Sequence, residues 1–327
     1  MRDYPEKIAL IFGREDIGLL QDELARCDIL VHVPTSDIYP ILNLSHAATI
    51  VMYELFGKTI DAPETLIEHI RKMNQATDKP WGINIPLMYP EIGRLMDIIV
   101  DEGVKVVFTS AGSPKKYTQM LHDAGIKVAH VVSSSKFARK CEEAGVDAVV
   151  AEGFEAGGHN GREETTTMAL IPQVRQATTL PLIAAGGIGS GQAMVAAEAL
   201  GAEGVQIGTL FALAKESSAA DEFKRLCTSI EEGDTMLCLK KISPTRLVKN
   251  ALYNRLAEAE ARGADADELR EMLGKAASKR GIFEGDTEDG EIEIGQIASA
   301  VKTIDDVATI MARLKAEYIE TKNRLAQ

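Results

Sequence analysis

The stretch with the clearest chemical content is residues 151–161, AEGFEAGGHNG, in which an apolar run ends in Glu152 and leads to Gly157, Gly158 and His159. Glycine lets the backbone approach a flat or phosphorylated ligand closely, because it has no side chain. A histidine can accept or donate a proton near neutral pH. The pattern therefore favours a cofactor site with a titratable residue beside it.

Two further apolar runs end in glycine, LIAAGGI at 182–188 and VQIGT at 205–209. Backbone N–H groups at such strand ends, next to the start of the following helix, form a cradle suited to one phosphate group. A single Gly-Gly pair is equally typical of an ordinary turn between a strand and a helix. The joint occurrence of three such strand ends favours a ligand that lies across them.

The elements that must position these residues alternate along the chain. Apolar strand patterns, most of them followed by helical periodicity, predict an α/β protein with a closed (βα)8 barrel, in which ligands bind at the carboxyl ends of the strands. The predicted strands span residues 8–12, 29–34, 82–87, 105–110, 127–132, 148–152, 182–186 and 205–208. The clearest predicted helices span 63–75, 92–102, 117–124, 135–144 and 194–200.

The pattern changes after the last predicted strand. Residues 214–275 are charged and helix-forming, which predicts an appended helical subdomain or lid. Residues 283–295, FEGDTEDGEIEIG, predict an acidic loop or short hairpin, and residues 297–325 predict closing helices. The predicted division is therefore 1–57, 58–213 for most of the barrel, and 214–327 for the C-terminal extension.

From about residue 61 onward the chain resembles the FMN-dependent barrels that include nitronate monooxygenases and the enoyl-acyl-carrier-protein reductase II enzymes. The resemblance is carried, in order, by DKPWGINIPL, VVFTSAGSP, HVVSSSKFA, AEGFEAGGHNG, LPLIAAGGI and EGVQIGT. The longer form EAGGHNGREETTT is more similar to the reductase II branch. The resemblance implies FMN as cofactor, NAD(P)H as co-substrate and a small-molecule or acyl-thioester substrate, and it leaves a homodimer open.

The resemblance also implies which residues form the site. His159 would act as a base or stabilise the anionic substrate in nitronate oxidation, and would orient the thioester or help to protonate carbon in enoyl reduction. The implied FMN-binding residues are Gly186, Gly187, Gly208 and Thr209 for the phosphate, Asn84, Ser110 and Glu152 for the ring and ribityl chain, and Gly157 and Gly158 at close backbone approach.

The N-terminus departs from this family. Residues 8–56, through FGREDIGL and PTSDIYPILNLSHA, resemble the C-terminal half of the SpoU-type (SPOUT) RNA methyltransferases. We favour an interpretation in which residues 1–57 supply the first strand, helix and second strand of the barrel, so that the chain is a chimera, because missing strands would leave exposed edges. Two alternatives are a recombined scaffold without native activity and a separate S-adenosylmethionine module with ligands at Gly13, Glu15, Gly18, Pro34, Asn43 and Ser45.

Composition bounds the possible partners. The formal net charge of -13 argues against nucleic acid and anionic membranes as partners. An acidic carrier protein would need a local basic cluster, for which the candidates are Lys240, Lys241, Arg246 and Lys249, although such a run is more often a solvated helix face. The 4 cysteines lack metal or disulfide spacing, the histidines form no metal motif, and no apolar run is long enough to span a membrane, which together predict a cytoplasmic enzyme without a metal site.

Two smaller groups have open interpretations. His130 lies on a predicted strand and is either a hydrogen-bonded core histidine, which we favour, or a residue facing the barrel interior. Arg162, Glu163 and Glu164 follow His159 and either order that loop, contact substrate or form a solvated cluster.

Overall fold

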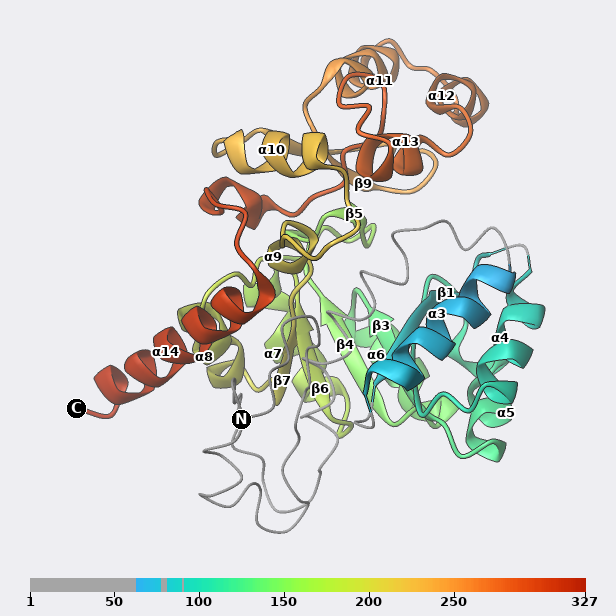
Figure 1. The fold of residues 1–327 in the computed structure, drawn as a ribbon, viewed down its shortest axis with the longest axis vertical. Helices are drawn as coiled ribbons and strands as arrows, with labels where there is room; N and C mark the ends of the chain where they lie inside the picture. The colour runs from blue at the N-terminus through green and yellow to red at the C-terminus, as the bar shows by residue number, and fades with distance from the viewer. Residues whose placement is uncertain (1–62, 78–80, 90) are drawn as a thin grey trace.

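A curved sheet of parallel strands is the centre of the computed structural model, which describes residues 63–77, 81–89 and 91–327 (Figure 1). In the described part of the chain the sheet has the order β1-β2-β3-β4-β6-β7, and each neighbouring pair is parallel. The strands are β1 (Gly82–Pro86), β2 (Val106–Ser110), β3 (Lys127–Val132), β4 (Ala148–Glu152), β6 (Leu182–Ala185) and β7 (Gly204–Gln206).

The strands form a sheet that is buried on both faces because their sequences are nearly continuous apolar runs. Val107, Val149 and Leu182 lie in the large cluster that packs the sheet against its helices. Phe108, Val150 and Ile183 belong to a separate cluster on the other, concave face. Alternate residues of each strand therefore fill two different cores, as the two-residue period of a strand requires.

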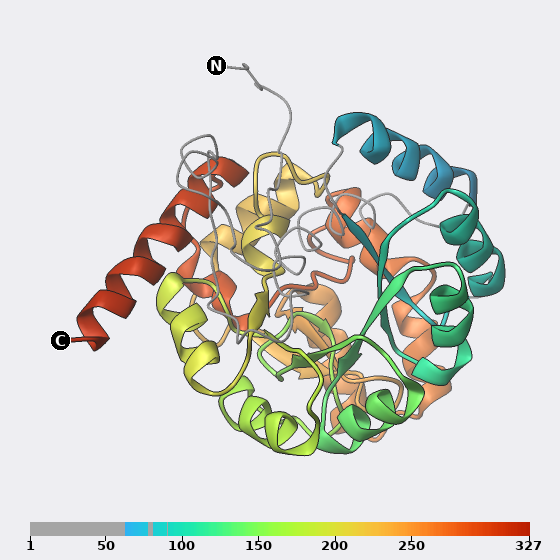
Figure 2. The same ribbon diagram turned by 90° about the horizontal axis from the view of Figure 1, so that it is seen from below.

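Helices cover the convex side of the sheet, and Figure 2 shows them in an arc around its outside. Their sequences place apolar side chains at helical spacing toward the strands, as in Leu95, Met96 and Ile99. They are α3 (Pro63–Ala76), α4 (Ile92–Asp101), η2 (Pro114–Lys116), α5 (Thr118–Asp123), α6 (Ser135–Ala144), α7 (Thr167–Ala177) and α8 (Gly191–Ala199).

The predicted α/β class and six of the predicted strands are confirmed, and the sheet is curled as in a partial barrel. The strands expected at 8–12 and 29–34 lie outside the described residues, as does the whole SPOUT-like segment with its candidate S-adenosylmethionine ligands. The helices expected at 63–75, 92–102, 117–124, 135–144 and 194–200 are present, whereas α7 was not among the predicted ones.

The C-terminal part adds a second sheet and more helices. β5 (Gly158–His159), β9 (Thr245–Val248) and β8 (Thr235–Cys238) form an antiparallel sheet in that order. The helices are α9 (Thr209–Ala212), α10 (Asp221–Ser229), α11 (Ala251–Ala261), α12 (Ala266–Leu273), α13 (Ala277–Phe283), η3 (Gln296–Ala300) and α14 (Val307–Leu325). Figure 1 shows α10 to α13 gathered at one end of the molecule, near β5 and β9.

The prediction that residues 214–275 form only helices was wrong for β8 and β9. These two strands form a hairpin, and β9 also pairs with β5, far earlier in the chain. Local helix propensity across a charged segment was overridden by this long-range pairing, which a single sequence does not reveal.

The final helix, α14, packs along α8. The Glu317 carboxylate accepts a hydrogen bond from the backbone N–H of Gly191 at 2.8 Å, and the Tyr318 hydroxyl donates to Glu198 at 2.7 Å. α14 thus adds a further helix against α8, on the outside of the sheet. Among the helices of the described residues, none combines the length and apolar character that crossing a bilayer needs.

Candidate active site

Two adjoining cavities lie at the carboxyl ends of the parallel strands. The larger, of about 890 Å³, is lined by residues from the ends of β1, β2, β3, β4 and β7 and from β5. The smaller, of about 220 Å³, is lined by the turns after β4, β6 and β7. Both are lined by Glu152, Gly157, Gln206 and Glu293. The two spaces therefore form one elongated site, of a volume typical of small-molecule and cofactor pockets.

His159 lies at the large-cavity end. It is in β5, where it pairs with Thr245 of β9, and its side chain is exposed toward the large cavity. Asn160 next to it donates its backbone N–H to Pro244 at 2.8 Å. The predicted catalytic histidine is thus held by a strand pairing rather than by a free loop, and it has room for a substrate beside it.

Two amide side chains face the site with an unused acceptor. Asn84 of β1 and Gln206 of β7 each have a buried side-chain oxygen that finds no hydrogen-bond partner within the described chain. Both residues line the large cavity, as does Ser110 at the end of β2. A buried acceptor without a partner is costly, so these oxygens are suited to the N–H groups of a bound ligand.

Glu152 ends β4 and lines both cavities. Burial raises the pKa of its carboxyl to about 7, because a charged carboxylate is poorly solvated there. The group therefore changes charge near neutral pH, at the junction of the two cavities.

The small cavity has the geometry of an anion cradle. Gly186 and Gly187 both have left-handed φ angles, 92° and 70°, which a residue with a side chain adopts only with strain. Gly208 and Thr209 line the cavity at the start of α9. No Lys or Arg is present in the lining that the structure describes, so backbone N–H groups alone would hold an anion there.

One of the carboxylates beside this cradle is already engaged. Glu155 accepts hydrogen bonds from the backbone N–H and the hydroxyl of Thr167, both at 2.9 Å, at the start of α7. These hydrogen bonds tie the loop after β4 to the start of α7.

His130 fits both interpretations that the sequence left open, a hydrogen-bonded core histidine and a residue that faces the interior of the barrel. It is buried, its Nδ1 lies 2.6 Å from the Thr109 hydroxyl, and it also lines the large cavity. Burial lowers the pKa of this histidine to about 4, so its imidazole is neutral at physiological pH.

Residues 162–164 order the loop after His159. Arg162 donates to the carbonyl oxygens of Lys240 and Ile242, both at 2.9 Å, and Glu164 pairs with Lys240. Glu163 accepts a hydrogen bond from Ser133 at 3.1 Å. Of the three interpretations of this cluster, the contacts support ordering of the loop against the turn between β8 and β9.

The proposed basic cluster at 240–249 is not a free patch. Arg246 is 1% exposed, donates to the Phe154 carbonyl at 2.7 Å and lies 4.6 Å above the Phe154 ring. Lys241 donates to the carbonyls of Gly263 and Ala264 near the end of α11. Arg246 therefore does not belong to the candidate basic cluster, because the β8–β9 hairpin, absent from the predicted fold, turns it inward.

Sequence reasoning missed Gln206, Glu155 and Glu293 as lining residues. Gln206 had a usable signal, since it is a polar residue inside the apolar run VQIG. Glu293 had none, because its position opposite Gly158 depends on contacts between segments far apart in the chain.

The fold and this site agree with the comparisons to known proteins. The model of the nitronate monooxygenase family matches residues 90–317. This chain belongs to the nitronate monooxygenase family. The model of the SpoU rRNA methylase family matches residues 1–53, in keeping with the resemblance of the N-terminal segment.

Curated relatives are enzymes acting on different substrates. A (3aS,4S,5R,7aS)-5-hydroxy-7a-methyl-1-oxo-octahydro-1H-indene-4-carboxyl-CoA dehydrogenase of Rhodococcus jostii is 30% identical over 277 residues, 73% of this chain and 77% of the relative. A protein of Staphylococcus saprophyticus named "Probable nitronate monooxygenase" is 33% identical over 233 residues, 66% of each chain.

Solved structures give the same result. FabK from Thermotoga maritima superposes with a TM-score of 0.81 at 33% identity, over 90% of this chain and 99% of that one. A nitroalkane oxidase from Streptomyces ansochromogenes has a TM-score of 0.71 at 23% identity, over 86% and 95%, and shares the fold. The expected oxidoreductase of the nitronate monooxygenase and reductase II type is therefore confirmed.

Proposed function

We propose that the elongated site binds FMN, with the phosphate in the small cavity and the ring in the large one. The observation that carries this proposal is the continuity of the two cavities, which puts glycine turns at one end and a histidine at the other. The buried oxygens of Asn84 and Gln206 support it, since a flavin ring and ribityl chain offer hydrogen-bond donors.

Each predicted residue then has a role. Gly186, Gly187, Gly208 and Thr209 would hold the phosphate, and Gly157 and Gly158 would let the backbone lie close to the cofactor. Asn84, Ser110 and Glu152 would fix the ring and ribityl chain. When bound, the flavin supplies hydride transfer. His159 would hold or release a proton at the substrate, on the open side of the large cavity.

The leading reaction is a reductase II-like reduction of an acyl thioester with NAD(P)H. The large cavity is open toward solvent at Met88, Lys115 and Phe137, so a long substrate could enter while its head group remains outside. The second candidate, oxidation of a nitronate, is favoured by the family match. In the first reaction His159 would orient the thioester or protonate carbon; in the second it would accept a proton or stabilise the anion.

The first experiment is a flavin titration of the purified chain, followed by its visible spectrum. We expect a yellow complex and protection of the folded state that grows with FMN concentration. Absence of both would contradict the proposal. NAD(P)H consumption with an enoyl thioester then supports reduction, and oxygen uptake with a nitroalkane anion, without NAD(P)H, supports nitronate oxidation.

We further propose that residues 1–57 complete the barrel beside β1 and β7. Each of these strands has a partner on one side only within the described sheet, and unpaired edges promote association. Deleting residues 1–57 should cause the chain to aggregate. A deleted chain that stays monomeric and folded, or full-length protein that binds S-adenosylmethionine in calorimetry, would favour a separate module instead.

A further inference from the structure

A pair of carboxyl groups lies against the proposed FMN site and is not explained by the roles above. Glu293 lines both cavities, and its Oε2 would be 2.5 Å from a Cβ at Gly158. Glu291, two residues earlier, is buried with 6% exposure. Both carboxyl groups approach the hydroxyl of Ser278 in α13.

The geometry at Ser278 requires a proton on the pair. Its Oγ is 2.9 Å from a Glu291 oxygen and 2.7 Å from a Glu293 oxygen. A hydroxyl has one hydrogen and donates it to one acceptor. The second contact is favourable only when the other carboxyl is protonated and donates to Oγ. The group formed by Ser278, Glu291 and Glu293 therefore carries one proton in addition to the hydrogen of the serine hydroxyl.

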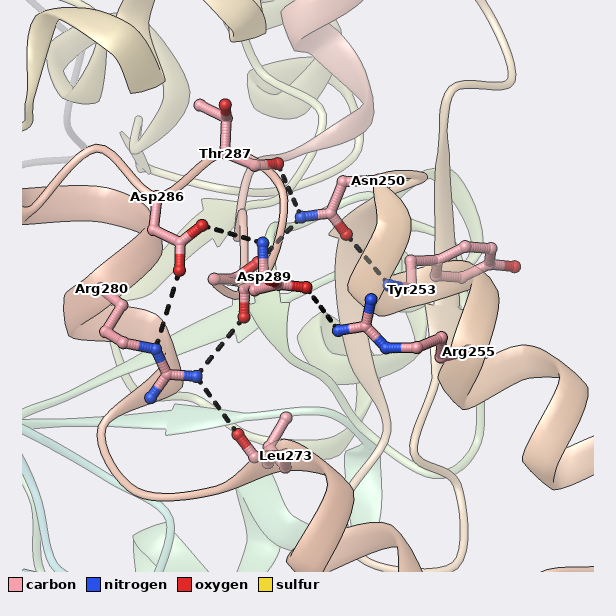
Figure 3. Close-up of polar contacts among 9 residues, drawn as sticks. Asn250, Tyr253, Arg255, Leu273, Arg280, Asp286, Thr287 and Asp289 are labelled. Atoms are coloured by element: carbon pink, nitrogen blue, oxygen red, sulfur yellow. Dashed lines mark hydrogen bonds and ion pairs between the residues drawn. The ribbon is translucent and has the colours of Figure 1, made fainter.

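The segment that carries the pair is rigidly held, as Figure 3 shows for the preceding loop. Asn250 donates to the carbonyls of Thr287 and Gly290, both at 2.9 Å. Arg255 pairs with Asp289 at 2.6 Å, and Arg280 contacts Asp286 at 3.8 Å. Val248 of β9 then donates to Ile292 at 2.9 Å, which places Glu293 opposite Leu247. These contacts hold the backbone that carries Glu291 and Glu293.

The charges around the small cavity explain why a protonated Glu293 would favour phosphate binding there. The small cavity has no basic residue in its described lining, while Glu152, Glu155 and Glu293 all line it. The Glu155 carboxyl accepts hydrogen bonds from Thr167. A phosphate dianion beside further ionised carboxylates would be repelled. A neutral Glu293 removes one of these repulsions.

We propose that Glu293 is an active-site acid that enters the cofactor cavity in its neutral form, with its proton shared through Ser278 with Glu291. Movement of the proton within the pair leaves the total charge of the pair unchanged. One carboxyl O–H bond breaks as Oγ of Ser278 accepts that proton, and Oγ passes its own hydrogen to the other carboxylate. When the proton is on Glu291, this relay can bring it to Glu293, which can then give it to the cavity. Both carboxyls are then ionised until the pair takes up another proton from solvent.

The groups that face the pair are consistent with this role. Burial raises the pKa of both carboxyls, that of Glu291 to about 7. His159 of β5 and Arg280 of α13 have the opposite effect and lower the pKa of Glu291. From the other elements, Glu152 at the end of β4 adds a titrating carboxyl in the same cavity, and Arg246 of β9 points toward Phe154 and Glu155.

The first test does not depend on FMN. Infrared spectroscopy of the purified full chain at about pH 6 should show the C=O stretch of neutral carboxylic acid. Replacing both Glu291 and Glu293 by Gln should reduce this band by one carboxyl, whereas Glu320→Gln, at an exposed position of α14, should not. Ser278→Ala should reduce it and Ser278→Thr, which keeps the hydroxyl, should retain it. An unchanged band in the variant that lacks both carboxyls would overturn the proposal.

The second test rests on the proposed function and uses binding. Between pH 7 and pH 9 the FMN phosphate stays a dianion, because a phosphate monoester has its second pKa near 6. FMN affinity of the native chain should fall about tenfold across this range, whereas riboflavin affinity should not. Glu293→Gln should bind FMN about tenfold more tightly than the native chain at pH 9.

The two tests separate the possible failures. The role of Glu293 at the cofactor would be overturned if Glu293→Gln bound FMN more weakly than the native chain at pH 9. It would also be overturned if the FMN affinity of this variant depended on pH as that of the native chain does. Failure of every variant and of the native chain to bind FMN would contradict the proposed function, and the infrared result would still decide whether the pair holds a proton.

Discussion

At the scale of single residues, the site depends on side chains whose protonation is set by burial. His130 is neutral at physiological pH because it is buried, whereas Glu152 titrates near pH 7 because it ends a buried strand at a cavity junction. His159 differs from both, since its side chain is exposed toward the large cavity. We therefore assign the proposed proton transfer with the substrate to His159 and not to His130, although both line the large cavity.

Replacing His159 tests its catalytic role. His159→Ala should lower kcat/KM about hundredfold, because a positioned general acid or base contributes this much, and should change FMN affinity little. Steady-state kinetics and flavin titration measure the two effects. His122→Gln, on the distant helix α5, is the matched control. A His159→Ala enzyme with native kcat/KM would remove the histidine from the mechanism.

Glu152 makes stability depend on pH. Because its folded pKa is raised to about 7, the unfolded chain, with a lower pKa, gives up the proton first as pH rises. The stability contributed by the protonated group is complete below about pH 4.5 and is lost as pH rises to about 7. Glu152→Gln should therefore match the native chain near pH 5 and exceed it by up to about 3 kcal/mol near pH 8 in urea unfolding. An equal difference at both pH values would contradict this assignment.

At the scale of elements, the antiparallel sheet of β5, β8 and β9 fixes His159 from outside the barrel layer. Its anchor is Arg246, whose buried guanidinium bonds the Phe154 carbonyl just before β5. The element that carries His159, the proposed catalytic residue, is thus positioned by a hairpin about ninety residues later in the chain.

Arg246→Ala should therefore destabilise the protein by about 3 kcal/mol, since it leaves a buried carbonyl without a donor and opens a cavity. Arg246→Lys should not restore stability, because an ammonium cannot reproduce two guanidinium contacts and the stacking on Phe154. Thermal unfolding measures both. Arg270→Ala, which removes an exposed pair with Asp267, should cost less than about 0.5 kcal/mol, and a similar loss in both Arg→Ala variants would refute the anchoring role.

At the scale of the whole molecule, the C-terminal helix α14 contributes to the packing of the described fold. It packs along α8, and it buries the side chains of Val307, Ile310, Met311 and Leu314. Each buried side chain of this size contributes about 1.5–3 kcal/mol, and together they compare with the full stability of a domain. The helix is part of the fold and not an appendage.

Removing residues 307–327 should abolish cooperative thermal unfolding, and Leu314→Ala should lower stability by about 3 kcal/mol. Removing only residues 325–327, which are exposed, should leave the transition unchanged. Circular dichroism melts compare the three chains. A cooperative native-like transition without α14 would show that the barrel layer does not need it.

The sequence by itself determined the parallel strands, the glycine turns and the histidine after Gly158, because buried strands and strand-end turns have local patterns of apolar residues and glycine. Those patterns indicated the family, and they predicted the residues to which we assign phosphate and ring binding, among them Asn84, Ser110 and Glu152. Only the tertiary structure decided the β8–β9 hairpin, the burial of Arg246 and the bridge from Ser278 to Glu291 and Glu293. These features join segments up to about ninety residues apart, and their energies arise from contacts that no local stretch of sequence specifies.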